Sequence, residues 1–177
     1  MTRPFSILAL ALCAGLSLSA QEGTHWVFVH GTHTRFDSDF PASNEGGYGL
    51  SYGGWLTNGF GVEARAVRTD LRASTAGALA DGDQTQYFGS ALFNLNPAGS
   101  KVFPYVAAGL GLTQTSAEFS DSGRRTARIN YHAGVGVQWR VGELFAVSAD
   151  SKYVQTQAAS NRRDWVNSLG LGMVWGR

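Results

Sequence analysis

The feature that most constrains the fold is an alternation of apolar and polar side chains, with a period of two residues, in eight segments. It is clearest where Tyr131, Val135 and Val137 fall on one face and His132 and Gln138 fall on the other. Successive side chains of a β-strand point to opposite faces, so this period predicts strands rather than helices. The predicted strands are Thr24–Arg35, Gly46–Leu56, Phe60–Leu71, Thr85–Leu95, Lys101–Thr113, Thr126–Arg140, Leu144–Gln155 and Asp164–Trp175.

The connections between these segments alternate in length. The short ones are 57–59, 96–100 and 141–143, and the long, polar ones are 36–45, 72–84, 114–125 and 156–163. The first short connection contains Asn58-Gly59, a pair typical of tight hairpins. Short turns that alternate with long loops are typical of a meander whose turns all lie at one end. The sequence therefore predicts an all-β chain, folded as an eight-stranded antiparallel up-and-down transmembrane β-barrel if one face meets lipid.

The N-terminal residues 1–20 have the pattern of a secretory signal peptide. Arg3 supplies a positive charge, an apolar stretch runs from Phe5 to Leu18, and the small residues Ser19 and Ala20 follow. We expect cleavage after one of these two, the alternative being an uncleaved membrane anchor. Residues 21–177 then form the barrel domain. Cys13 is the only cysteine, so the exported domain would have no disulfide and no thiol chemistry.

Ionised residues lie in mid-strand on one face of the predicted barrel. Glu63 and Arg65 belong to one strand, and Asp150 and Lys152 belong to another. Small residues fall mostly on the same face, as a lumen filled with side chains requires in an eight-stranded barrel. Charges of both signs can compensate one another there. The predicted lumen charge network comprises Glu63, Arg65, Asp150 and Lys152, together with Arg128 and Arg140 nearer the strand ends.

The opposite face is apolar, with Val135, Val137, Leu169 and Leu171 among its residues. A soluble ligand-binding barrel would have the reverse pattern, with an apolar interior and a polar outside. We therefore predict that the apolar face meets lipid. Two roles for the lumen charges stay open. They form a structural network that fills the lumen, which we favour, or a gate that opens a narrow ion path when partners exchange.

The tryptophans lie near the ends of the predicted strands, where aromatic side chains mark a membrane interface. Trp55 falls on the parity opposite to Tyr48, Leu50 and Tyr52, and a bulge at Gly53-Gly54 would return it to the lipid-facing side. Trp165 is expected at the end of the barrel opposite to the others. The predicted interface aromatics are Trp26, Trp55, Trp139, Trp165 and Trp175.

Three segments, Pro104–Gly111, Gly134–Trp139 and Leu169–Trp175, together with the signal peptide, make the chain resemble a known family. It is similar to the small eight-stranded outer-membrane barrels of the OmpA/OmpX type, over the whole length that follows the signal peptide. The resemblance implies a location in the cell outer membrane and loops exposed outside the cell. It also implies that the outer-membrane insertion machinery recognises the last strand. It is specific for architecture and not for an activity.

Residues that could carry chemistry are few. His30 and His33 could bind a metal with Asp37 or Asp39, but we favour histidines of the rim or a loop. A catalytic set of Ser148, His132 and Asp150 could assemble across strands. The deacylases among lipid-modifying outer-membrane barrels resemble one another in a His-x-Ser pattern on one strand, whereas His132 is followed by Ala133 and Gly134. We predict no enzyme, no cofactor and no metal.

The remaining expectations concern partners. The net charge of +1 provides no strong field for nucleic acid. Arg124-Arg125 and Arg162-Arg163 lie in predicted loops, where they could meet anionic lipopolysaccharide, although soluble loop tips are the favoured interpretation. We expect contact with outer-membrane lipid and lipopolysaccharide, and a monomer. Three functions remain, in decreasing order of preference: a structural or surface-interaction protein, a narrow ion-conducting pore, and a lipid-modifying enzyme.

Overall fold

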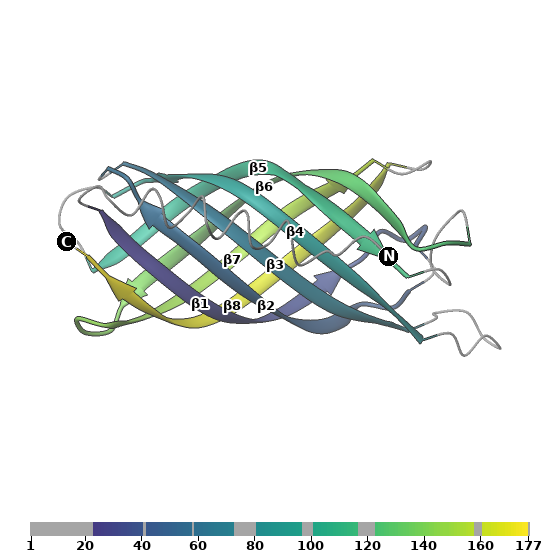
Figure 1. Ribbon diagram of the computed structural model, residues 1–177, viewed down its shortest axis with the longest axis horizontal. Coiled ribbons are helices and arrows are strands. Elements are labelled where there is room, and N and C mark those ends of the chain that lie inside the picture. Colours follow the sequence, from purple (N-terminus) through teal and green to yellow (C-terminus); the bar gives the residue numbers. More distant parts are fainter. Residues whose placement is uncertain are drawn as a thin grey trace.

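The chain folds into one closed barrel of antiparallel strands that tilt steeply across its long axis (Figure 1). The computed structural model describes residues 23–40, 42–57, 59–72, 81–96, 101–116, 123–157 and 161–176. The strands are β1 (Thr24–Arg35), β2 (Glu45–Trp55), β3 (Phe60–Arg72), β4 (Asp81–Asn94), β5 (Val102–Thr115), β6 (Thr126–Arg140), β7 (Phe145–Thr156) and β8 (Arg162–Trp175). The predicted eight-stranded barrel is confirmed. The predicted signal peptide, 1–20, lies outside the described residues.

Closure depends on β1, which pairs with β2 on one side and β8 on the other. Thr24 is opposite Trp55, and Arg35 is opposite Trp165. Every strand therefore has two hydrogen-bonded neighbours, and the sheet has no edge that could pair with another chain. In the part of the chain that the structure describes, no helix is long and apolar enough to cross a bilayer.

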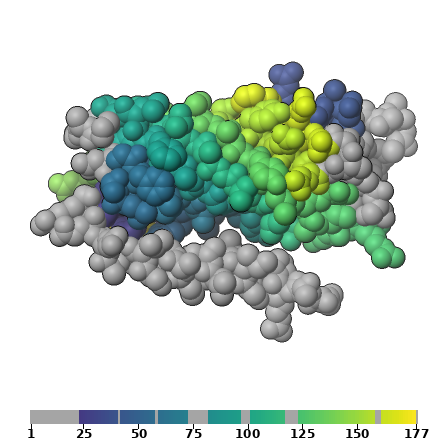
Figure 2. Space-filling model, turned by 90° about the horizontal axis from the view of Figure 1, so that it is seen from above, coloured from purple at the N-terminus to yellow at the C-terminus, as the bar shows by residue number. Residues whose placement is uncertain are grey.

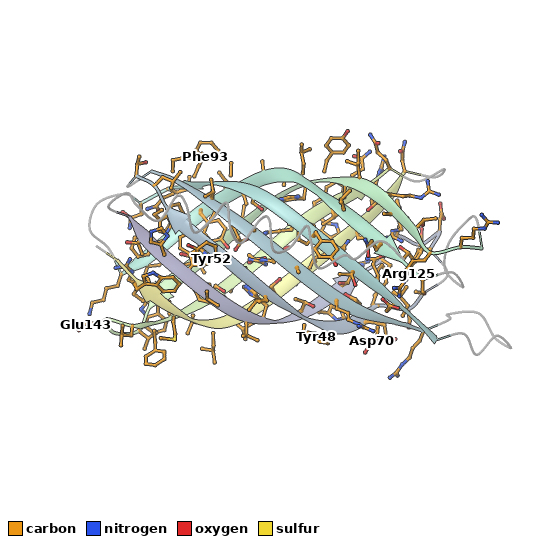
Figure 3. All side chains as sticks on the ribbon, in the orientation of Figure 1. Tyr48, Tyr52, Asp70, Phe93, Arg125 and Glu143 are labelled. Atoms are coloured by element: carbon orange, nitrogen blue, oxygen red, sulfur yellow. The ribbon has the colours of Figure 1, made fainter. Side chains whose placement is uncertain are left out.

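The two ends of the barrel differ as the connection lengths predicted. At the short-turn end, the Val141 N–H donates to the Phe145 carbonyl at 2.8 Å, and Gly142 between them has a φ of 112°. A positive φ is easy only for glycine, so this residue lets β6 turn directly into β7. Figure 3 places Glu143 at this end and Arg125 at the opposite, long-loop end.

The outside of the barrel is apolar. Val29, Leu169 and Leu171 each expose more than 60% of their surface, and they alternate along their strands with buried residues. Such exposed apolar side chains make up an outer wall, and Figure 2 shows one side of the barrel's outer surface. A wall of this kind is unfavourable in water and suits a hydrocarbon surround. The predicted lipid-facing band is therefore present in the structure.

Side chains fill the lumen in three layers, and an apolar cluster of Val67, Phe88, Val154 and Val166 is buried with them. Near the short turns lies an aromatic plug, and in the middle lie the charged residues of β3 and β7. Near the long loops lies a loop-end cap of Phe36, Phe40, Ala42 and Leu71. The aromatic plug consists of Trp26, Phe28, Trp55, Leu92, Tyr105, Ala107, Ala146 and Val174.

The prediction that Trp26 and Trp55 face the membrane interface is wrong. Both are buried in the lumen, with their ring centroids 5.5 Å apart. The ladder between β1 and β2 runs through Gly53 and Gly54 without interruption, so the predicted bulge does not form. Trp55 keeps the parity of Ser51, which is buried and points inward. Simple alternation placed both tryptophans correctly, and the preference of tryptophan for interfaces did not.

Candidate functional site

Four ionised side chains meet in the middle of the lumen and form a central network. Arg65 of β3 reaches across to β7, where its Nη2 and Nη1 donate to the two carboxylate oxygens of Asp150 at 2.6 and 2.9 Å. The same Nη2 donates to Glu63 Oε2 at 3.0 Å. Lys152 Nζ donates to Glu63 Oε1 at 2.8 Å. These side chains are at most 2% exposed. Four members of the predicted network thus lie together, with a balanced charge.

Two polar residues complete this network. Ser168 Oγ accepts from Arg65 Nη1 at 3.1 Å, and the Tyr105 hydroxyl donates to Asp150 Oδ2 at 3.3 Å. Sequence reasoning missed both, although each has the inward parity of its strand. With these contacts, most hydrogen-bonding groups of the buried ions are satisfied. A buried ion pair is tolerated only under that condition.

Glycines on the lumen side make room for these contacts. Gly136 lies between Tyr105 and Asp150 in the register of β5, β6 and β7. A Cβ on Gly136 would lie 2.5 Å from the Tyr105 hydroxyl oxygen and 2.7 Å from Asp150 Cβ. Gly109 has the same role between Ser90 and His132, which join across it at 2.8 Å. A side chain on either glycine would block the bridge between two strands that are not neighbours.

Arg128 and Arg140 do not belong to the central network, contrary to the prediction. Arg140 lies at the short-turn end of β6, where its Nη2 donates to Thr24 Oγ1 at 2.7 Å and its guanidinium stacks on Phe103. Arg128 lies near the opposite end of β6, opposite Thr113. The ion pairs described for the centre of the lumen join only residues of β3 and β7. The prediction placed both arginines nearer the strand ends and grouped them with the central residues because they share the inward parity, but a shared parity does not bring residues at different heights into contact.

The histidines do not assemble a catalytic or metal site of the kind considered. His132 Nε2 is bonded to Ser90 rather than to Ser148, and Asp150 is engaged by Arg65. His30 points inward, and its Nε2 is hydrogen-bonded to Ser51 Oγ at 2.8 Å, whereas His33 points outward. Within the described ranges, no three of His, Cys, Asp and Glu gather in a metal-binding group.

Arg162 is not a loop residue but closes the long-loop end of the lumen. Its Nε donates to Asp164 Oδ2 at 3.0 Å, and an Nη donates to Gln84 Oε1. Its guanidinium lies 4.1 Å from the centre of the Phe40 ring, a cation–π contact with the loop-end cap. The favoured interpretation of Arg162 as a soluble loop tip is therefore wrong. Arg124 and Arg125 are exposed as expected, and Arg125 pairs with Asp83 at 2.8 Å.

The other predicted interface aromatics lie on the outer wall. Trp139 and Trp175 are 52% and 41% exposed near the short-turn end, and Trp165 is 48% exposed near the long-loop end. Outward tyrosines add to them, including Tyr48 and Tyr52 (Figure 3). Aromatic residues at two heights are typical of the girdles of a transmembrane barrel.

A family comparison decides what kind of barrel this is. The model for the outer membrane protein beta-barrel domain matches residues 6–176. The chain belongs to this outer-membrane barrel family. In such barrels the short turns face the periplasm and the longer loops face outward. The same orientation for this chain would make its short-turn end the periplasmic one and its long-loop end the extracellular one.

Solved structures agree with this membership at the level of the fold. Ail, the attachment invasion locus protein of Yersinia pestis, is 22% identical, with a TM-score of 0.59 over 88% of this chain and 100% of its own. Neisserial surface protein A is 19% identical, with a TM-score of 0.63 over 86% and 99%. The N-terminal barrel domain of Pseudomonas aeruginosa OprF is 22% identical, with a TM-score of 0.58 over 86% and 99%. No curated protein sequence matches the chain.

Proposed function

We propose that this outer-membrane barrel has a structural and surface-interaction role, with its long connections exposed outside the cell. The observation that carries the proposal is the filling of the lumen by packed side chains in all three layers. The aromatic plug is apolar, and Trp26 and Phe28 within it are fully buried. The central network is equally buried. A barrel with a filled lumen anchors the chain in the membrane. Its outer rim and its outer wall are then the surfaces that contact partners.

The partners that suit this surface are outer-membrane lipid and lipopolysaccharide. Exposed arginines at the extracellular end, such as Arg125 and Arg163, can form charge-assisted hydrogen bonds with phosphate or sulfate groups. Ail has been crystallised with the heparin analogue sucrose octasulfate, which is a polyanion. We further propose a cleaved signal peptide, recognition of β8 by the insertion machinery, a monomeric barrel, and no catalytic activity.

Two measurements test the role. The purified protein should run faster on a gel before heating than after it, and it should give no steady current in a planar lipid bilayer. Antibody against an epitope inserted at 117–122 should bind intact cells, and an epitope at 141–143 should stay hidden. A protein that dissolves without detergent as a folded monomer, or whose 117–122 epitope is hidden, would contradict the proposal.

A narrow ion-conducting pore is the second candidate, and the central network is the observation that favours it. Arg65 contacts both Glu63 and Asp150, so an exchange of partners needs only small side-chain movements. If this exchange opens a path, wild-type protein should carry a steady current that Glu63→Ala or Lys152→Ala alters. A silent wild-type barrel, with no change in either variant, would exclude the pore.

A further inference from the structure

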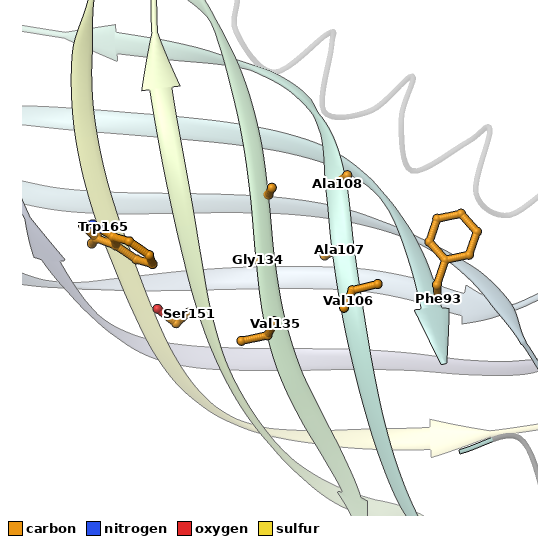
Figure 4. Close-up of a pocket in the computed structure, with 9 residues that line it drawn as sticks. Phe93, Val106, Ala107, Ala108, Gly134, Val135, Ser151 and Trp165 are labelled. Carbon is orange, nitrogen blue, oxygen red and sulfur yellow. The ribbon is translucent and has the colours of Figure 1, made fainter. Parts of the chain in front are cut away.

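A groove crosses the outer wall from β4 to β8. Its volume is about 580 Å³, and its lining is almost entirely apolar (Figure 4). Phe93 and Trp165 stand at its two ends, and Val106, Ala108, Ala133 and Val135 lie between them. Ser151, with its hydroxyl, and Trp165, with its indole N–H, supply the polar side-chain groups among the residues that line it.

Strand register explains why the wall is hollow here. Ala91, Ala108 and Ala133 are consecutive partners across β4, β5 and β6, so three small side chains lie side by side. The next outward row contains Val106 and Val135, which are partners of each other and rise beside the alanines. Small residues beside larger ones leave a trough on the surface of a pleated sheet.

The groove descends through the membrane. Trp165 lies near the extracellular end of β8, whereas Phe93 is next to the periplasmic end of β4. Ala133 lies in the middle of β6, between these two heights. The groove therefore begins at the outer interface and passes down through the hydrocarbon layer, which is the path of an acyl chain from an outer-leaflet lipid.

Positive charge lies at the upper end of this groove. Arg35 of β1 is the register partner of Trp165, and Arg163 precedes Trp165 by two residues on the same outward face. Both arginines are exposed. Asp37 is also close, because its carboxylate accepts the main-chain N–H of Arg163 at 3.2 Å. Arg35 and Arg163 therefore lie on the strands beside Trp165, at the upper end of the apolar groove, where a phosphate could bind both guanidinium groups.

We propose that this composite surface binds one phosphorylated glycolipid of the outer leaflet, of the lipopolysaccharide type. Its phosphate binds Arg35 and Arg163, and one of its acyl chains lies in the groove below Trp165. Guanidinium groups recognise phosphate by paired hydrogen bonds, and a chain in a groove makes more contacts than one on a flat wall. The inference rests on the extracellular orientation and on the lipid partner proposed above, to which it adds a site.

The test is retention of lipid A by the full chain, purified in detergent and measured by native mass spectrometry with added lipid A. Wild-type protein should retain one molecule. Ala133→Phe fills the groove from the lipid side and should weaken retention by about tenfold, the effect of losing one good contact. Val29→Phe adds the same ring to the outward face of β1 and is the matched control. Equal retention by these two variants would overturn the proposal.

A second pair of variants tests the phosphate end. Arg35→Gln with Arg163→Gln should weaken retention of lipid A, whereas Arg72→Gln, an exposed outward arginine of β3, should not. Phosphatidylethanolamine should be retained less well than lipid A, and a dimer should not form. Equal retention of both lipids, or dimers that Ala133→Phe abolishes, would assign the groove to another occupant and overturn the site. The barrel and its surface role would survive that result, because gel mobility and epitope exposure test them separately.

Discussion

The short-turn half of the lumen, the lower half, and the long-loop half, the upper half, are closed by different kinds of contact. The aromatic plug closes the lower half by apolar packing, and Trp55 Nε1 donates to Gln138 at 3.3 Å. Among the described residues, the upper half has the larger share of buried polar atoms without a protein partner, including both polar atoms of Gln86, Nε2 of Gln84 and Oδ1 of Asn130 and of Asp164. Within the aromatic plug, Trp26 Nε1 is such an atom. Buried polar atoms of this kind require water, so we expect the upper half to be more hydrated than the plug. The central network lies at the boundary between the two.

The largest expected loss of stability comes from a substitution in the central network, at the boundary between the two halves. Arg65→Leu removes the group that holds Asp150 and Glu63, and leaves two buried carboxylates for one lysine. Loss of one partner from a buried ion pair costs about 3–5 kcal/mol of stability. Urea unfolding in lipid vesicles, followed by gel mobility, measures it. A loss below about 1 kcal/mol would show that water reaches the centre, because a screened pair contributes little.

The second largest loss of stability is expected from a truncation in the aromatic plug. Leu92→Ala in the aromatic plug leaves a cavity among apolar side chains, and we expect a loss of about 2–3 kcal/mol. The same unfolding measurement applies, with Leu169→Ala on the lipid-facing wall as the matched control. Leu169 is 64% exposed to the membrane side, so its truncation should cost clearly less. Equal losses in the two variants would mean that the plug is not tightly packed.

A side chain added beside the central network should cost less stability than either of these changes. Gly136→Ala places a methyl group against the Tyr105 hydroxyl and Asp150, and both must shift. We expect a loss of about 1–3 kcal/mol, the usual cost of overpacking. Gly142→Ala, at a turn with positive φ and open space, separates backbone strain from crowding. The added Cβ lies 2.5 Å from both Cζ and the hydroxyl oxygen of Tyr105, so Gly136→Ala and Tyr105→Ala together should cost less than the sum of their separate losses. Strictly additive losses would argue against a clash with this side chain.

The smallest effect is expected in the hydrated half. Gln86→Leu removes a buried amide that has no protein partner, so stability should change by less than about 1 kcal/mol. Asn130→Leu is the contrast, because its Nδ2 donates to Thr113 Oγ1 at 3.0 Å and that bond would be lost. A loss of more than about 2 kcal/mol for Gln86→Leu would remove the distinction between the two halves.

The sequence predicted the strands, their order and their faces because each depends on a local pattern. The alternation of inward and outward side chains placed Trp55 in the lumen, which is correct. The prediction instead followed the preference of tryptophan for membrane interfaces and placed it on the outside. The pairing of Arg65 with Asp150 was predicted only as membership of one network. Which residues meet across a lumen depends on the stagger between β3 and β7, and no local pattern encodes it.

The same limit applies to the groove and to the cap. Ala91, Ala108 and Ala133 are far apart in the chain, and they form a trough only once register aligns them. Arg162 is next to Arg163 in sequence, and a run of two arginines in a predicted loop suggests solvent. The structure extends β8 to Arg162, and alternation then points one arginine inward and the other outward.

The glycine-spanning bridges bear on how such a barrel assembles. Tyr105 and Asp150 meet over Gly136, and Ser90 and His132 meet over Gly109. Each bridge therefore joins a strand to the next but one, and neither half of it has its partner until the third strand has arrived. A hairpin alone gains its main-chain ladder but leaves these inward groups exposed. Each of these hydrogen bonds can form only when three consecutive strands are in place. The barrel therefore gains most of its polar contacts between side chains in the last steps before it closes.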